Sequence, residues 1–143
     1  MNNTKCSFCR INPRSHSFRE LPELDGTTQN IRVFYSSVPS IKVFYSRPTD
    51  AELYRDTASV VHHFECELSG VGDWEWIFDC DGMEIGHYTQ FGLVRDLCQL
   101  FKQHGGLRRV KIINSGWLIN LTVRCARLVW PELPAISIHP DGN

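Results

Sequence analysis

Two carboxylates stand one residue apart, directly after an apolar segment in the middle of the chain. Asp79 and Asp81 follow residues 74–78, and Gly82 completes an Asp-x-Asp-Gly sequence. Two neighbouring carboxyl groups can act together in catalysis. One attacks an electrophile as the nucleophile, while the other acts as the general acid and donates a proton to the leaving group. The same residue types also form tight turns without chemistry, since Asp accepts backbone hydrogen bonds and Gly adopts a positive φ. The sequence leaves both interpretations open, and the turn is the simpler one.

A second polar group follows the next apolar segment, residues 107–113. It consists of Asn114 and Ser115, with Gly116 after them. The residues between the two apolar segments are enough for a helix, so the whole stretch predicts a parallel β-α-β unit. Both strands then deliver polar residues to the carboxyl edge of the sheet, where open α/β sheets place ligands and catalytic groups. This edge is the first place where we expect function.

Cysteine and histidine near the N-terminus offer a different chemistry. Cys6 and Cys9 form a Cys-x-x-Cys pair, which is half of a structural zinc site, and His16 is a third candidate ligand. Because structural zinc takes four ligands, the fourth must come from farther along the chain, from Cys66 or a histidine beside it. A zinc ion bound by Cys6, Cys9, His16 and Cys66 would hold the N-terminal segment on the domain. The alternative is a pair of thiols in an irregular terminus.

The elements that position these groups alternate between strand and helix. Residues 1–30 are polar and contain several turn signals, which predicts an irregular, cysteine-containing N-terminal segment. Residues 31–143 are predicted to form a single α/β domain with a mixed, largely parallel sheet, flanking helices and the order β-β-α-β-α-β-α-β. The predicted strands are residues 31–36, 41–46, 74–78, 107–113 and 135–138, and the predicted helices are residues 48–68, 88–104 and 117–130.

Two details of this assignment carry predictions of their own. Residues 31–36 and 41–46 are a near-repeat, which predicts either a hairpin or one strand beside its duplicate. In the first helix Phe64 belongs to the apolar stripe, so His63 and Glu65 fall on its flanks. We therefore expect a solvated helix face at this point rather than a catalytic histidine.

Residues 74–139 resemble the core of the CRAL-TRIO lipid-binding domain. In that family an apolar strand ends in Asp-x-x-Gly, here residues 79–82, and a later strand ends in Ile-Ile-Asn, here residues 112–114. The resemblance implies an α/β fold and a binding function, for lipid or, in divergent relatives, for protein. The domains of the family continue into a gate helix that walls the lipid pocket, whereas this chain ends at Asn143. We therefore expect a C-terminally short version that binds through its surface.

A second resemblance covers only the Asp-x-Asp-Gly turn. Haloacid-dehalogenase-type phosphatases place this motif after an apolar strand, which would make Asp79 the nucleophile, Asp81 the general acid and Ser115 a phosphoryl ligand. Such enzymes also need a lysine and further acids that complete a Mg²⁺ site. Beyond Ser115 the chain has no lysine, and its only acids there are Glu132 and Asp141. We therefore expect no enzymatic activity and keep the phosphatase as an alternative.

The composition narrows the function classes further. The chain has 143 residues and a formal net charge of -1, with basic and acidic residues interspersed, which argues against a nucleic-acid partner. No apolar run is long enough to span a bilayer and no signal peptide begins the chain. We therefore expect an intracellular protein, either soluble or part of an assembly. Its six cysteines are expected to be reduced thiols.

The predicted function is binding. The segment 117–130 carries an apolar stripe too wide for one strand to cover, so we expect a contact surface formed by Trp117, Leu118, Leu121 and Trp130. A protein partner is the first expectation, as for a structural subunit of a larger assembly such as a viral capsid. A lipid or another apolar ligand, or a membrane surface, is the alternative. No cofactor is expected apart from the candidate structural zinc.

Overall fold

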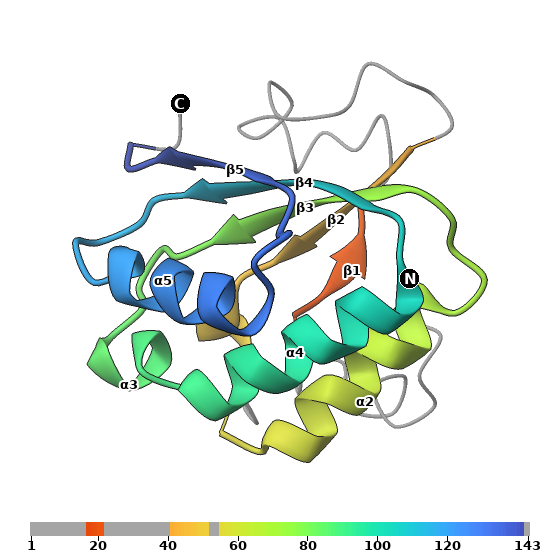
Figure 1. Ribbon diagram of the computed structural model, residues 1–143. Helices are drawn as coiled ribbons and strands as arrows, with labels where there is room; N and C mark the ends of the chain where they lie inside the picture. Colours follow the sequence, from red (N-terminus) through yellow and green to blue (C-terminus); the bar gives the residue numbers. More distant parts are fainter. Residues whose placement is uncertain (1–16, 22–40, 52–54, 142–143) are drawn as a thin grey trace.

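The chain folds around one sheet, and its strands and helices alternate along the sequence (Figure 1). This computed structural model describes residues 17–21, 41–51 and 55–141. The strands are β1 (Arg19–Glu20), β2 (Lys42–Ser46), β3 (Trp74–Asp79), β4 (Leu107–Ile113) and β5 (Ala135–His139). The helices are α2 (Thr57–Leu68), α3 (Ile85–Tyr88), α4 (Phe91–His104) and α5 (Ile119–Val129), and a 3-10 turn, η2 (Pro48–Asp50), follows β2.

The strands of the described residues lie side by side in sequence order, β1-β2-β3-β4-β5. β1 is antiparallel to β2, whereas β2, β3, β4 and β5 are parallel to one another. Crossovers between parallel strands share one hand, so a sequential order places their helices on the same face of the sheet. Figure 1 shows α2, α4 and α5 on that common face. The predicted α/β class, with a mixed and largely parallel sheet in one domain, is confirmed.

Aromatic side chains fill the core between the sheet and the helices. The ring of Phe18 is 1% exposed and stacks on Phe64, with 3.9 Å between the ring centroids, and on Phe44, with 5.0 Å. Trp74 and Phe101 pack edge to face in the same cluster, 5.3 Å apart. Edge-to-face and offset-stacked pairs are favourable beyond the apolar area that they bury. This cluster therefore fixes α2 and α4 against β2 and β3.

Residues 17–21 belong to this fold, although the sequence predicts an irregular segment over residues 1–30. β1 pairs with β2 through Arg19 and Tyr45, and the amide of Leu21 donates a hydrogen bond to the carbonyl of Val43, 2.8 Å away. The prediction is wrong for Arg19–Glu20, because a two-residue strand is too short to show a period-2 pattern. The rest of residues 1–30 lies outside the described residues.

The first helix begins later than predicted. Pro48 starts the short turn η2, and α2 begins only at Thr57, where the side chain of Asp56 accepts a hydrogen bond from the amide of Ser59 at 3.2 Å. Aspartate is a preferred N-cap because its carboxylate satisfies an amide that has no partner within the helix. The predicted start at residue 48 is therefore wrong, and the cap at Asp56 explains the actual one.

The prediction of a solvated flank around Phe64 is wrong for His63. This side chain is 1% exposed, and its Nε2 lies 2.6 Å from the carbonyl oxygen of Phe18. Glu65 is exposed, as predicted. The difference arises because residues 17–21 pack beside α2 and need a hydrogen-bonding partner for a buried carbonyl, a long-range contact that helical periodicity cannot reveal.

The second face of the sheet has a smaller apolar cluster and a buried ion pair. Ile77 and Ile113 are 0% and 1% exposed and cluster with Val43 on this face. Glu75 and Lys111 also alternate onto it, with 4.0 Å between Glu75 Oε1 and Lys111 Nζ. Burial lowers the pKa of Lys111, and the carboxylate of Glu75 opposes that shift. The sheet is therefore buried on both faces at its centre.

Two predictions concern features that the structure describes only in part. Residues 31–36, the first half of the predicted hairpin, lie outside the described residues, whereas residues 42–46 form β2 as predicted. The hairpin stays a prediction. None of the described helices is long and apolar enough to cross a membrane.

Candidate functional site: the carboxyl edge and an apolar cavity

Asp79 ends β3 at the carboxyl edge of the sheet and accepts three hydrogen bonds there. Its Oδ2 accepts from the hydroxyl of Tyr45 at 2.5 Å. Its Oδ1 accepts from the amide of Asp81 at 2.9 Å and from Nδ2 of Asn114 at 3.0 Å. Asp79 is 6% exposed. The edge thus unites residues from β2, β3 and the end of β4 around one buried carboxylate, which locks the ends of three strands together.

Asp81 has a different environment from Asp79, although only one residue separates them. Its carboxylate is exposed and pairs with the guanidinium of Arg47 at 2.9 Å. Its carbonyl accepts a hydrogen bond from the hydroxyl of Thr49 at 2.9 Å, and Gly82 after it has φ +79°. Residues 79–82 therefore form a tight turn that is tied to the end of β2. A left-handed φ explains why glycine occupies position 82.

A groove lies beside this turn. Ser115 and Gly116 line one wall, and the amide of Gly116 donates a hydrogen bond to the hydroxyl of Tyr88 at 2.8 Å. Two large apolar side chains flank the groove and are strongly exposed, Ile85 at 68% and Trp117 at 80%. The structure thus brings Asp79 and Asn114 into contact. Ser115 lies in the neighbouring groove and makes no hydrogen bond to Asp79 or Asp81.

Cys80 is the reactive residue type nearest to this turn, and its surroundings keep it protonated. Burial, together with the charge of Asp79, raises the pKa of the Cys80 thiol to about 12. The thiolate is the nucleophilic form of cysteine, so Cys80 is a poor nucleophile at neutral pH.

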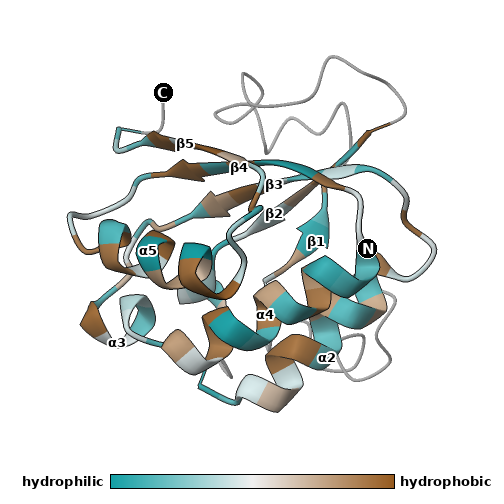
Figure 2. Cartoon of the chain, in the orientation of Figure 1, coloured by the Kyte–Doolittle hydropathy of each residue, from teal (hydrophilic) through white to brown (hydrophobic). Residues whose placement is uncertain are grey.

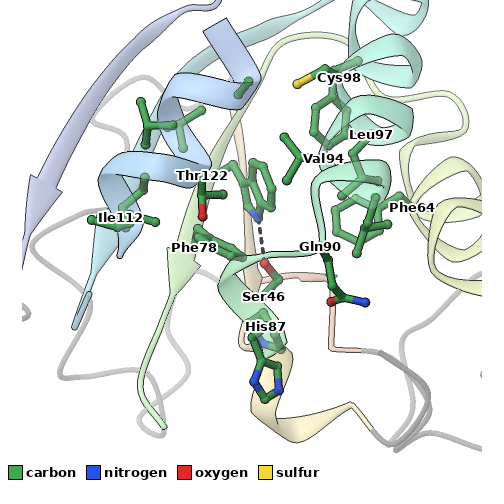
Figure 3. A pocket seen from close by; sticks show the side chains of 18 of the residues that line it. Ser46, Phe64, Phe78, His87, Gln90, Val94, Leu97, Cys98, Ile112 and Thr122 are labelled. Carbon is green, nitrogen blue, oxygen red and sulfur yellow. Dashed lines mark hydrogen bonds between the residues drawn. The ribbon is translucent and has the colours of Figure 1, made fainter. Parts of the chain in front are cut away.

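An apolar cavity that the sequence does not predict lies between the sheet and the helices. Its volume is about 150 Å³, and Figure 3 shows it from close by. Carbon atoms make up almost all of its wall, which comes from β2, β3 and β4 on one side and α2, α4 and α5 on the other. Its lining includes Phe64, Trp76, Phe78, Val94, Leu97, Ile112, Val123 and Ala126.

The polar groups in the cavity wall are mostly satisfied within the protein. The hydroxyl of Ser46 accepts a hydrogen bond from Nε1 of Trp76 at 2.8 Å, the contact dashed in Figure 3. The hydroxyl of Thr122 donates to the carbonyl of Tyr88, also at 2.8 Å. None of the described lining residues is Asp, Glu, Lys or Arg. A ligand in this cavity would therefore meet an uncharged surface.

One end of the cavity is more polar than the other. Figure 3 shows Ser46, His87 and Gln90 toward one end, whereas Leu97 and Cys98 lie away from them. Nδ1 of His87 accepts a hydrogen bond from the amide of Glu84 at 3.0 Å, so the neutral ring carries its proton on Nε2. Burial lowers the pKa of His87, which keeps the ring neutral. The polar end thus contains a neutral imidazole and an amide.

The zinc prediction falls mainly on residues outside the description. Cys6, Cys9 and His16 are not among the described residues, whereas Cys66 lies near the end of α2 with its Sγ 3.5 Å from Nε2 of His62. In the described ranges no group of three or more His, Cys, Asp and Glu side chains could hold a metal ion. The four-ligand zinc site therefore stays a prediction.

The four residues of the predicted contact surface differ in exposure. Trp117 is 80% exposed and Leu121 is 43% exposed, whereas Leu118 and Trp130 are half-buried and pack against the main core. Leu128 is 80% exposed and belongs with Trp117 and Leu121 on the surface. The outward residues of α5 thus form a surface without Leu118 and Trp130.

Comparison with known proteins assigns no family. No protein-family model matches the chain, and no curated protein matches it. The resemblance of residues 74–139 to CRAL-TRIO domains therefore stays a prediction that rests on its short motifs.

Proposed function

We propose that this protein is a non-enzymatic binding module that holds a small, neutral, mainly apolar ligand between its sheet and its helices. The observation that carries this proposal is the cavity of about 150 Å³ with its carbon-lined wall. Protein interiors are close-packed and have few voids larger than a water molecule. Apolar cavities of about this size take up benzene-sized groups. The ligand therefore has one ring or a short alkyl tail.

The polar end of the cavity restricts which head group the ligand can carry. A buried charge needs a partner of opposite charge, and the described lining has no charged side chain. The polar side chains at this end include His87 and Gln90, which are uncharged. A neutral head such as an alcohol, an amide or an ester fits this end, and a carboxylate or an amine does not.

The bonding of Asp79 supports a binding function over the phosphatase alternative. A nucleophilic carboxylate must reach its substrate, but Asp79 is 6% exposed and both of its oxygens already accept hydrogen bonds. Asp81 is held by Arg47. The two aspartates therefore suit a structural turn better than an in-line attack on phosphorus.

A protein partner is the second candidate, and the position of β5 favours it. Among the described strands β5 pairs only with β4, which makes it an edge strand of the sheet that the structure describes. Ile138 on this strand is 38% exposed. Exposed edges pair readily with a strand from another chain, as the subunits of an assembly do.

Ligand binding can be tested with hexanol and benzene as probes and hexanoate as the charged comparison. At about ten times Kd, a probe that binds only the folded state should raise Tm by about 4 °C. We expect this rise for hexanol and benzene but not for hexanoate. Val123→Phe, and the milder Ala126→Leu, fill the cavity and should remove the rise. Asn120→Phe adds the same ring to the exposed side of α5 and should keep it.

Two results would count against this function: no rise with the neutral probes, or an equal rise in the cavity-filling variants. Backbone amide chemical shifts, recorded in the same titration, show whether a probe lies between the sheet and the helices. Native mass spectrometry of the purified protein then separates the two candidates. A bound ligand adds a small mass to the monomer, whereas assembly through β5 gives multiples of the chain mass.

A further inference from the structure

The outward face of α5 is an exposed stripe that the core does not use. Leu121, Arg124 and Leu128 are spaced by three and four residues, which aligns them along one side of the helix. Leu128 is 80% exposed and Leu121 43%. Trp117, just before the helix, is also 80% exposed. Figure 2 shows both strongly hydrophobic and strongly hydrophilic residues along α5. We call Trp117, Leu121, Arg124, Arg127 and Leu128 the α5 face.

The charge of the α5 face is positive, although the chain as a whole is nearly neutral. Arg124 and Arg127 make no ion pair or hydrogen bond within the described residues, and both are exposed. No Asp or Glu lies between Asp96 and Glu132 in the sequence. Glu84, which lines the groove beside Trp117, has its carboxylate bonded to the backbone of His87. The near-zero net charge therefore conceals a local basic surface.

We propose that the α5 face binds the surface of a bilayer that contains anionic phospholipid. Exposed aliphatic side chains gain by entering the boundary between headgroups and acyl chains, while arginines beside them contact anionic headgroups. Tryptophan favours this interface because its ring is apolar and its N–H is polar. The α5 face combines these three features within one helix and the turn before it.

The size of the α5 face favours a bilayer over a protein partner. A helix of 11 residues is about 16 Å long. Stable protein interfaces bury about 800 Å² on each partner and need a shape that matches. A bilayer needs no matching shape, and it supplies many anionic groups to two arginines that have no acidic partner among the described residues.

The position of α5 links the bilayer to the cavity. Its inner side, which includes Val123 and Ala126, lines the cavity, while Leu121 and Leu128 lie on the opposite side. If the α5 face binds the bilayer, helix α5 lies between the bilayer and the cavity. An apolar ligand could then be exchanged between the two. This last consequence rests on the proposed function, whereas binding to the bilayer does not.

The test is co-sedimentation of the full chain with vesicles of phosphatidylcholine alone or with about 30% phosphatidylserine. The anionic vesicles should bind at least about tenfold more tightly, and the difference should shrink as salt is added. Arg124→Glu with Arg127→Glu should lower the affinity by more than about tenfold. Lys102→Glu makes the same change of charge as each of these two substitutions, at an exposed position of α4, and should leave binding unchanged.

Tryptophan fluorescence supplies an independent measurement on the same samples. Trp117 is far more exposed than Trp74, so bilayer entry should shift its emission to the blue, and Trp117→Phe should remove the shift. Equal binding to both vesicle types, no binding at all, or a dimer that buries Leu128 in solution would overturn the proposal. Ligand binding is measured without vesicles, so its failure is distinguishable from a failure here.

Discussion

At the scale of single residues, Asp79 shows how one side chain organises the carboxyl edge. Its hydrogen-bond donors come from β2, from its own turn and from the residue after β4. Hydrogen bonds to a charged group contribute about 1.5–3 kcal/mol each, more than those between neutral groups. Asp79 therefore stabilises the arrangement of the strand ends, even though its type and position first indicate catalysis.

We predict that Tyr45→Phe destabilises the protein more than Tyr88→Phe does. Both changes remove one buried or half-buried hydroxyl, but Tyr45 donates to the carboxylate of Asp79, whereas Tyr88 accepts from the neutral amide of Gly116. The expected losses are about 2 kcal/mol for Tyr45→Phe and about 1 kcal/mol for Tyr88→Phe. Urea unfolding at neutral pH measures both. A smaller loss for Tyr45→Phe would contradict the role given to Asp79.

The sequence indicates some residues of the carboxyl edge but not others, because the others are far away along the chain. Asp79 and Asn114 both end strands of one β-α-β unit, so their common edge follows from local pattern. Tyr45 is 34 residues before Asp79, and nothing local identifies it as a partner. The parallel register that sets Tyr45 beside Ile77 brings it there. Residues that strand pairing brings together can be predicted from the sequence only where the pairing itself can be predicted.

At the scale of elements, the connection from α4 to β4 depends on two successive glycines. The sequence predicts the end of the helix at Gly105 and Gly106, and the amide of Gly105 indeed donates to the carbonyl of Phe101 at 2.9 Å. Both glycines have positive φ, +76° and +86°. The carbonyl of Gly106 then accepts from the amide of Trp74 at 2.8 Å, which starts the pairing of β3 with β4.

We predict that Gly106→Ala costs clearly more stability than Gly105→Ala. Both substitutions force alanine to a positive φ, which costs about 1–3 kcal/mol. A Cβ on Gly106 would also overlap the backbone carbonyl of Gly72, while one on Gly105 would meet open space. Thermal unfolding of the two variants separates the two costs. Equal losses would show that the close approach of the two loops is not rigid.

The sequence predicts helices well where packing alone decides them and less well where a single cap decides. Residues 117–130 and 88–104 contain α5 and α4, because apolar stripes persist over several turns. The predicted start of the first helix at Pro48 is wrong because Asp56 is the N-cap of α2. The cavity could not be predicted at all. Apolar periodicity shows which sides of α4 and α5 face the sheet, but it does not show whether side chains fill the space between them.

At the scale of the whole molecule, burial in the core controls the protonation of two thiols, those of Cys80 and Cys98. The described cysteines, which are Cys66, Cys80, Cys98 and Cys125, form no disulfide among themselves. Burial raises the pKa of Cys80 to about 12 and that of Cys98 to about 11. Burial also raises the pKa of Tyr45, and its hydrogen bond to Asp79 adds to the shift. The folded protein therefore keeps protons that the unfolded chain releases at alkaline pH.

We predict that the free energy of unfolding falls steadily as the pH rises from about 8.5 to about 11. Cysteine in the unfolded chain ionises near pH 8.5, whereas the folded chain keeps both buried thiols protonated up to their raised pKa values. The unfolded state then binds fewer protons than the folded state, so stability is complete below pH 8.5 and decreases above it. By about pH 10 the loss should reach about 2 kcal/mol for each buried thiol. Urea unfolding across this range measures the slope.

The contribution of a single thiol to this slope identifies its cause. Cys80→Ala removes one of the two thiols whose pKa is raised, so the slope between about pH 8.5 and pH 10, below the ordinary pKa of tyrosine, should fall by close to half. A flat profile in the parent protein would mean that Cys80 and Cys98 ionise as readily in the folded state as in the unfolded one. The core between the sheet and the helices would then admit water, and a cavity open to water at Cys98 would also fail to hold an apolar ligand.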